Sequence, residues 1–180
     1  MTEALIAACR AGTINENETL NLNEIRRLIE EENADIEVIF TFIGREATPF
    51  ICAVLRNNID MMNLLLELGA NISGTNNLYN ENALHMAVGN GLNTDNATMQ
   101  FLLDRMPIEA INHQSNLFDQ GWTPLDYCYP PHINGEVNEE LVALIRQHGG
   151  KRKSELINPQ EARRQISYFA GQGAPRLLKF

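Results

Sequence analysis

Residues Thr48–Ser73, TPFICAVLRNNIDMMNLLLELGANIS, form the stretch of this sequence that decides the fold. Thr48 can cap the first turn of a helix whose first position is Pro49, because proline there loses no hydrogen bond. A second helix is indicated by apolar residues that recur at spacings of three and four and so share one face: Met62, Leu65 and Leu66. Gly69 follows, where glycine easily adopts the left-handed conformation that ends a helix. The stretch therefore predicts two consecutive helices.

The opening of this stretch recurs twice further along the chain. TPFICAV at Thr48–Val54 is matched by NALHMAV at Asn82–Val88 and by TPLDYCY at Thr123–Tyr129, and the three starts are 34 and 41 residues apart. An internal repeat of this length indicates helical units that bury their apolar faces by stacking. The motif and the residues after it resemble the TPLHxAA signature and the second helix of ankyrin repeats. The resemblance implies an all-α solenoid of about four helix-turn-helix units with hairpin fingers.

Carried along the whole chain, the resemblance implies an ankyrin-repeat domain over residues 1–151, with units at about 1–42, 43–76, 77–117 and 118–151. The first unit lacks the TPLH opening, and Pro130-Pro131 should end the first helix of the last unit early. Residues 152–180 depart from the family. Within them, Asn158-Pro159-Gln160-Glu161 has the features of a helix start. We therefore expect a basic tail whose helix over 158–169 caps the last unit.

Charge is distributed unevenly along the chain. The net charge of −9 consists of −15 on residues 1–145 and +6 on residues 146–180. An acidic body repels nucleic acid and anionic lipid and favours a partner with a basic surface. The prediction is no nucleic-acid and no membrane partner, with association through the basic tail as the alternative. No apolar run approaches the ~20 residues of a membrane span, and no basic segment precedes the apolar N-terminal stretch, so a cytoplasmic location is expected.

Residues able to do chemistry are few and dispersed. His85 and Asp126 occupy the histidine position of the repeated motif, where the resemblance implies hydrogen bonding to neighbouring hairpins. Cys9, Cys52 and Cys128 lie at equivalent places on first helices, which indicates buried reduced thiols. The sequence has no glycine-rich phosphate loop, no HExxH motif and no Cys/His cluster with metal spacing. We therefore predict no enzyme, no cofactor and no metal; the alternative is an enzyme or substrate-recruiting subunit whose site the C-terminal tail completes.

The resemblance also implies where a partner binds, because ankyrin stacks use the concave surface made by the hairpin tips and the exposed sides of the first helices. In this sequence those positions are Arg45, Leu55, Arg56, Leu78, Tyr79, Glu81, Asn90, Gln120 and Trp122. Tyr79 and Trp122 are the strongest candidates, since aromatic residues dominate binding hot spots. The alternative for Trp122 is packing on the next hairpin. The prediction is a monomeric protein-binding module that acts as an adaptor or an inhibitor.

Composition adds a prediction about origin. Asparagine accounts for 21 of the 180 residues, and the repeats carry insertions. In both respects the chain is similar to ankyrin proteins that intracellular bacteria deliver into host cells. The apolar end Leu177–Phe180 is compatible with a C-terminal secretion signal. A bacterial effector secreted into the host cell cytosol is therefore one form of the prediction, and the sequence leaves the partner's identity open.

Overall fold

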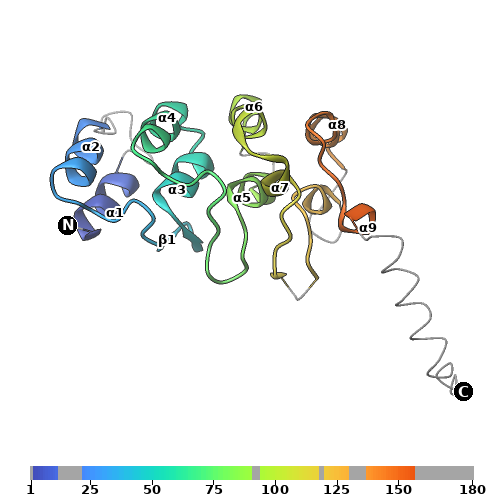
Figure 1. The fold of residues 1–180 in the computed structure, drawn as a ribbon, viewed down its shortest axis with the longest axis horizontal. Coiled ribbons are helices and arrows are strands. Elements are labelled where there is room, and N and C mark those ends of the chain that lie inside the picture. The colour runs from blue at the N-terminus through green and yellow to red at the C-terminus, as the bar shows by residue number, and fades with distance from the viewer. Residues whose placement is uncertain (1, 12–21, 91–93, 118–119, 130–136, 157–180) are drawn as a thin grey trace, which may run out of the picture.

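The computed structural model of this chain describes residues 2–11, 22–90, 94–117, 120–129 and 137–156. Its elements are almost all short helices, with a hairpin and the 3-10 turn η3 among them (Figure 1). In chain order they are α1 (Thr2–Arg10), α2 (Leu22–Glu30), β1 (Phe40–Phe42), β2 (Arg45–Ala47), α3 (Pro49–Leu55), α4 (Ile59–Glu67), α5 (Ala83–Gly89), α6 (Asn96–Arg105), α7 (Ile108–Ile111), η3 (Asp126–Cys128), α8 (Glu139–Gln147) and α9 (Lys153–Leu156).

These helices stand in two rows, and long loops project from one side of the stack (Figure 1). The outer row contains α2, α4, α6 and α8, while α1, α3, α5 and η3 form the inner row nearer the loops. Inner-row neighbours are in contact from α1 to α3, from α3 to α5 and from α5 to η3. One cluster of buried apolar side chains runs through both rows. The chain therefore advances in one direction, with the N-terminus at one end of the stack and α9 at the other.

The helix pair α3–α4 shows why the sequence folds in this way. The Thr48 hydroxyl accepts a hydrogen bond from the Ile51 amide at 3.2 Å, and Asn58 caps α4 by accepting from the Met61 amide at 2.8 Å. Gly69 ends the pair in the left-handed region, with φ of +97°. The buried face of α4 consists of Met61, Met62, Leu64 and Leu65. Leu66, which the spacing assigned to that face, is half-buried at its edge.

One finger contains a true β-hairpin, so the fold is not entirely helical. β1 and β2 pair antiparallel, with Phe40 opposite Ala47 and Phe42 opposite Arg45. The two residues between the strands, Ile43 and Gly44, have φ of +45° and +79°. Positive φ at both central residues is the turn geometry that matches the right-handed twist of paired strands. The predicted hairpin finger is therefore present here. The predicted all-α fold class is corrected, because the structure also contains this two-stranded sheet.

The last helix pair departs from the others. The segment after Thr123 forms only the single 3-10 turn η3 rather than an α-helix. The nine-residue helix α8 then follows at Glu139–Gln147. Gly149 ends α8 with φ of +82°. Pro130-Pro131 and the predicted capping helix at 158–169 lie outside the described residues.

Candidate partner-binding surface

The projecting loops are tied to one another in sequence order. The Glu46 carboxylate on the first finger accepts hydrogen bonds from the backbone amides of Asn77 and Leu78, at 3.1 and 2.9 Å. The second finger is joined to the third through the Tyr79 carbonyl, which accepts from the Asn116 amide at 2.6 Å. These links place the finger tips at fixed distances from their neighbours. The tips therefore form a continuous edge along the stack.

A hollow of about 330 Å³ lies between the first two fingers, on the side where a partner is expected. Its lining combines aromatic, aliphatic and charged side chains: Thr41, Gly44, Arg45, Glu46, Asn76, Leu78, Tyr79, Glu81 and Leu117. Leu78 is 59% exposed and Tyr79 is 37% exposed, although both are large and apolar. Four of the residues named from the sequence, Arg45, Leu78, Tyr79 and Glu81, are thus brought together around one concavity.

Two sequence predictions of exposure are wrong. Leu55 is only 7% exposed and belongs to the apolar core, because the inner row of helices packs around the end of α3. Glu81 is only 4% exposed. Its carboxylate accepts hydrogen bonds from the Tyr127 hydroxyl at 2.8 Å and from the Asn76 amide group at 3.1 Å. Glu81 therefore shapes the wall of the hollow from within, and Leu55 supports the helix beneath it.

Other predicted contact residues have structural partners of their own. The Arg56 guanidinium donates to the carbonyls of Cys9 and Ala11, at 2.5 and 2.8 Å, and so closes the end of α1. Asn90 caps α5 and is half-buried. Gln120 is exposed on the third finger, and its carbonyl accepts a hydrogen bond from the Lys153 ammonium. Arg56 and Asn90 lie at the ends of α3 and α5 and Gln120 lies on the third finger, so the structure does not bring them into the hollow.

Trp122 was considered both as a partner contact and as a packing residue. The indole is half-buried and packs edge to face on Tyr127, with ring centroids 6.4 Å apart. Its backbone carbonyl accepts a hydrogen bond from His85 Nε2 at 3.0 Å, when that nitrogen carries the proton. The indole therefore packs on η3 of its own helix pair.

His85 performs the structural task predicted for it. Its backbone amide donates to the Asn82 side chain at 3.1 Å, and its ring completes the capping box of α5. Complete burial lowers the pKa of His85 to about 3, which keeps the imidazole neutral. A neutral ring that is bonded at both nitrogens is a bridge between units rather than a catalytic base.

Asp126 has the equivalent role in the last helix pair. Burial alone would raise its pKa, but hydrogen bonds from the Lys153 backbone amide at 2.8 Å and from Arg152 Nε at 2.9 Å lower it below the usual value. The Thr123 amide also donates to this carboxylate, at 3.1 Å. Asp126 therefore anchors the segment that follows α8, as His85 anchors the third finger.

The three cysteines are buried thiols, as the sequence predicted. Burial raises the pKa of Cys9 and of Cys128 to about 12 and that of Cys52 to about 11. A thiol with so high a pKa is a poor nucleophile at neutral pH. In the part of the chain that the structure describes, no three His, Cys, Asp or Glu side chains are placed to hold a metal ion. Across the same residues, no helix has the length and apolar character needed to cross a bilayer.

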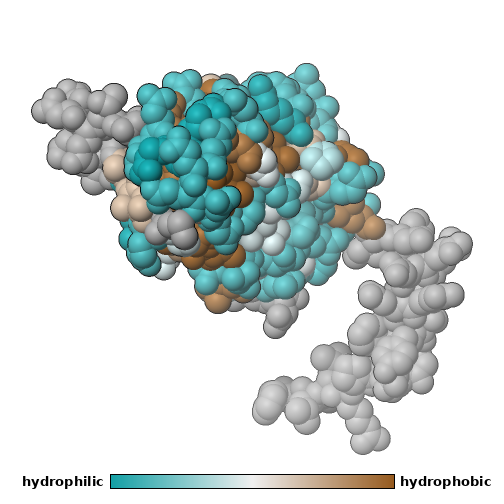
Figure 2. All heavy atoms as spheres, turned by 60° about the vertical axis from the view of Figure 1, so that its left-hand side comes forward, coloured by the Kyte–Doolittle hydropathy of each residue, from teal (hydrophilic) through white to brown (hydrophobic). Residues whose placement is uncertain are grey.

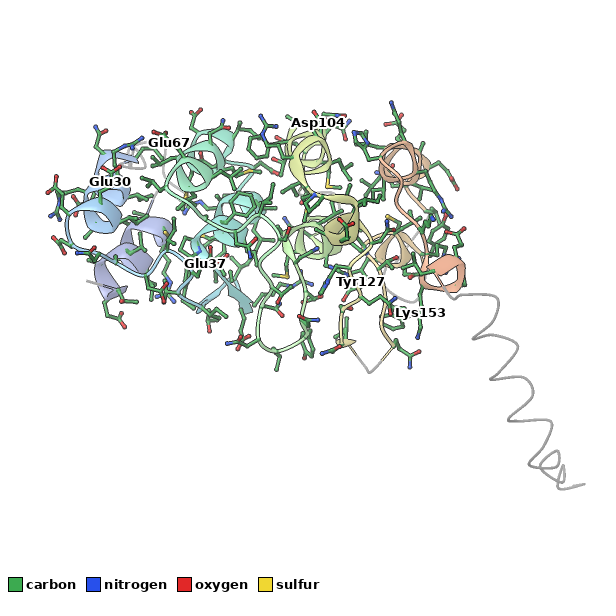
Figure 3. The ribbon with its side chains drawn as sticks, in the orientation of Figure 1. Glu30, Glu37, Glu67, Asp104, Tyr127 and Lys153 are labelled. Carbon is green, nitrogen blue, oxygen red and sulfur yellow. The ribbon has the colours of Figure 1, made fainter. Side chains whose placement is uncertain are left out.

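Carboxylates are prominent on the outer row, away from the fingers. Glu30, Glu67 and Asp104 lie along this row (Figure 3). Arg26 bridges two of them, at 3.1 Å from Glu30 and 3.0 Å from Glu67. Seen from the N-terminal side, hydrophilic residues cover most of the surface and apolar patches are small and separated (Figure 2).

Some residues of the surface were not anticipated from the sequence. Glu46 and Leu117 line the hollow, and Ile43 is 63% exposed at the tip of the first finger. The turn position of Ile43-Gly44 between alternating aromatic residues is a signal that could have placed Ile43 at a hairpin tip. No local signal marks Leu117, because its place depends on how successive fingers align.

Helix pairs stacked in single file, with fingers joined edge to edge, are an arrangement typical of repeat proteins. The model of the family described as ankyrin repeats (many copies) matches residues 50–96, which span α3 to the start of α6. This part of the chain therefore carries ankyrin repeats. No curated protein matches it at a significant level.

Proposed function

We propose that this chain is a protein-binding module, an adaptor or an inhibitor, that holds its partner along the fingers and the inner row of helices. Ankyrin repeats mediate binding between proteins, and the fold alone is shared by binders of many kinds, so the function depends on the particular surface. No catalytic role is proposed, because the thiols and His85 are committed to the core and to bridging units.

The hollow between the first two fingers is the observation that carries this proposal. Two large apolar side chains, Leu78 and Tyr79, stay exposed beside it at 59% and 37%. Tyrosine in a recess next to aliphatic groups is a typical anchor in protein interfaces. The finger-to-finger hydrogen bonds fix the spacing of these groups, so little ordering is needed when a partner binds.

The proposal has finer parts that rest on the sequence. It includes four ankyrin units over residues 1–151 and a C-terminal cap in residues 152–180, and it includes a monomer that meets a partner with a basic surface. The acidic outer row supports the last part, since it would attract such a partner from a distance. The asparagine-rich composition supports action in the cytoplasm, including the cytosol of a host cell after secretion.

Site-specific photo-crosslinking tests the proposed surface. A photoreactive amino acid at position 78 or position 120 should trap the same partner, which mass spectrometry then identifies. The same amino acid at position 104, on the outer row, is the matched control. Capture of that partner from position 104 and not from positions 78 and 120 would assign binding to the outer helices and refute the proposal.

Deletion of residues 157–180 tests the cap. A cap covers the apolar end of the last unit, so its loss should lower the melting temperature of the remaining repeats. An unchanged melting temperature would remove the cap from the proposal and leave the partner surface unaffected.

A further inference from the structure

Arg45 has an unusual place in this acidic protein. It begins β2, opposite Phe42, and its half-buried side chain reaches from the first finger across to α5. There its guanidinium lies against Gly89, where a Cβ atom would be only 3.3 Å from one of its terminal nitrogens. A larger residue at position 89 would push the guanidinium away. Glycine at that position thus allows the positive charge to lie on the floor of the concave surface.

The charge of Arg45 has no carboxylate partner among the residues that the structure describes. Its one hydrogen bond there goes to the Met86 sulfur, at 3.8 Å. By contrast, Arg26, Arg27, Arg146 and Arg152 each form an ion pair with a carboxylate. A guanidinium carries five N–H donors, and a half-buried one is costly to leave with a single weak acceptor. A group that supplies oxygen acceptors at this point would therefore be bound favourably.

The two carboxylates that share the hollow with Arg45 are already engaged. Glu46 accepts from the backbone amides of Asn77 and Leu78, and Glu81 is held by Tyr127 and Asn76. Neither forms an ion pair with Arg45 within the described part of the chain. Their negative charges still disfavour a doubly charged ligand such as a phosphoryl group, which each carboxylate would repel. A single carboxylate suits one arginine in a fork-to-fork geometry.

We propose that Arg45 binds an aspartate or glutamate side chain of the partner, and that this contact fixes the register of the partner on the fingers. The inference rests on the proposed protein-binding function and adds the chemistry of one contact to it. Exposed Leu78 and Tyr79 would contact apolar residues next to that carboxylate. A partner whose surface is basic overall can carry such a residue, since long-range attraction and local register come from different charges.

A displayed library of random 12-residue peptides is the probe that tests this contact. The wild type should enrich peptides that share an aspartate or glutamate at one position, and Arg45→Glu should enrich lysine or arginine there. Arg105→Glu is the control, because it makes the same charge change on an exposed residue of the outer row. Circular dichroism and melting temperature establish that each variant is folded.

A double-mutant cycle then isolates the pair. A selected peptide and its Asp→Asn form should differ about tenfold or more in affinity for the wild type, as expected for a hydrogen-bonded charge. They should bind Arg45→Gln within about twofold of each other. Peptides that lose affinity for Tyr79→Ser but show no difference between Asp and Asn would overturn the Arg45 contact and leave the binding function standing. Failure to enrich any peptide that depends on Tyr79 would overturn both.

Discussion

The buried histidine makes the stability of this protein depend on pH in a window that begins at a higher pH than that of the carboxylates. His85 has a pKa of about 3 in the folded chain against an ordinary value of 6.5. Between these values the unfolded chain binds a proton that the folded chain does not, so stability falls as the pH is lowered below about 6.5. From pH 7 to pH 5 this one group should reduce the free energy of unfolding by about 2 kcal/mol. A loss of that size is a large fraction of the stability of an ordinary domain, about 5–15 kcal/mol.

Urea unfolding followed by circular dichroism at pH 7, 6 and 5 measures this loss. Replacing the ring removes the titration, so His85→Gln should be less stable at pH 7 but show a much smaller decrease from pH 7 to pH 5. His148→Gln is the matched control and should retain the steep decrease, because His148 is only partly buried, beside Asp104. Equal decreases in the wild type and His85→Gln would refute the reasoning. That result would mean that the imidazole accepts a proton without unfolding of the third helix pair.

Three further predictions address packing, backbone and binding. Leu65 is fully buried on α4, so Leu65→Ala should lower the free energy of unfolding by about 2–5 kcal/mol, and an unchanged denaturation midpoint would contradict the assigned face. At Gly69, φ is +97° and open space surrounds the position. Gly69→Ala should therefore lower the free energy of unfolding by about 1–2 kcal/mol through backbone strain alone. The control Asn63→Ala, on the exposed face of α4, should change it by less than about 0.5 kcal/mol. Tyr79→Ala should weaken partner binding by about 2 kcal/mol without lowering the melting temperature. Trp122→Ala should lower the melting temperature, because the indole packs on Tyr127. Calorimetry of both variants measures the binding free energy and the melting temperature and so separates the two outcomes.

Local sequence was sufficient where local chemistry determines the structure. The Thr48 cap and the left-handed Gly69 depend on residues within a few positions, and both are present in the structure. The role of His85 was also predictable, but only through resemblance to a family, because its acceptor lies on Trp122, 37 residues further on.

The errors arise where burial depends on distant parts of the chain. Glu81 was expected at an exposed tip, yet Tyr127 supplies a hydroxyl that holds its carboxylate inside. Leu55 and Arg56 are adjacent and were expected to be alike, but one side chain enters the core and the other closes α1. That Arg45 has no carboxylate partner within the described residues could not be predicted, because it depends on which carboxylates the folded chain brings near. Periodicity describes one helix at a time and says nothing about these encounters.

The three buried thiols can report local opening of the stack through their rates of alkylation. Cys9, Cys52 and Cys128 belong to α1, α3 and η3, so they sample different places along the stack. Each can be alkylated only when its own part of the solenoid opens to solvent. The order in which they react would therefore report whether the stack frays from its ends or opens as a whole, without any introduced probe. Because all three are unreactive in the closed state, a cysteine placed at a finger tip would also be the first site labelled by a maleimide dye.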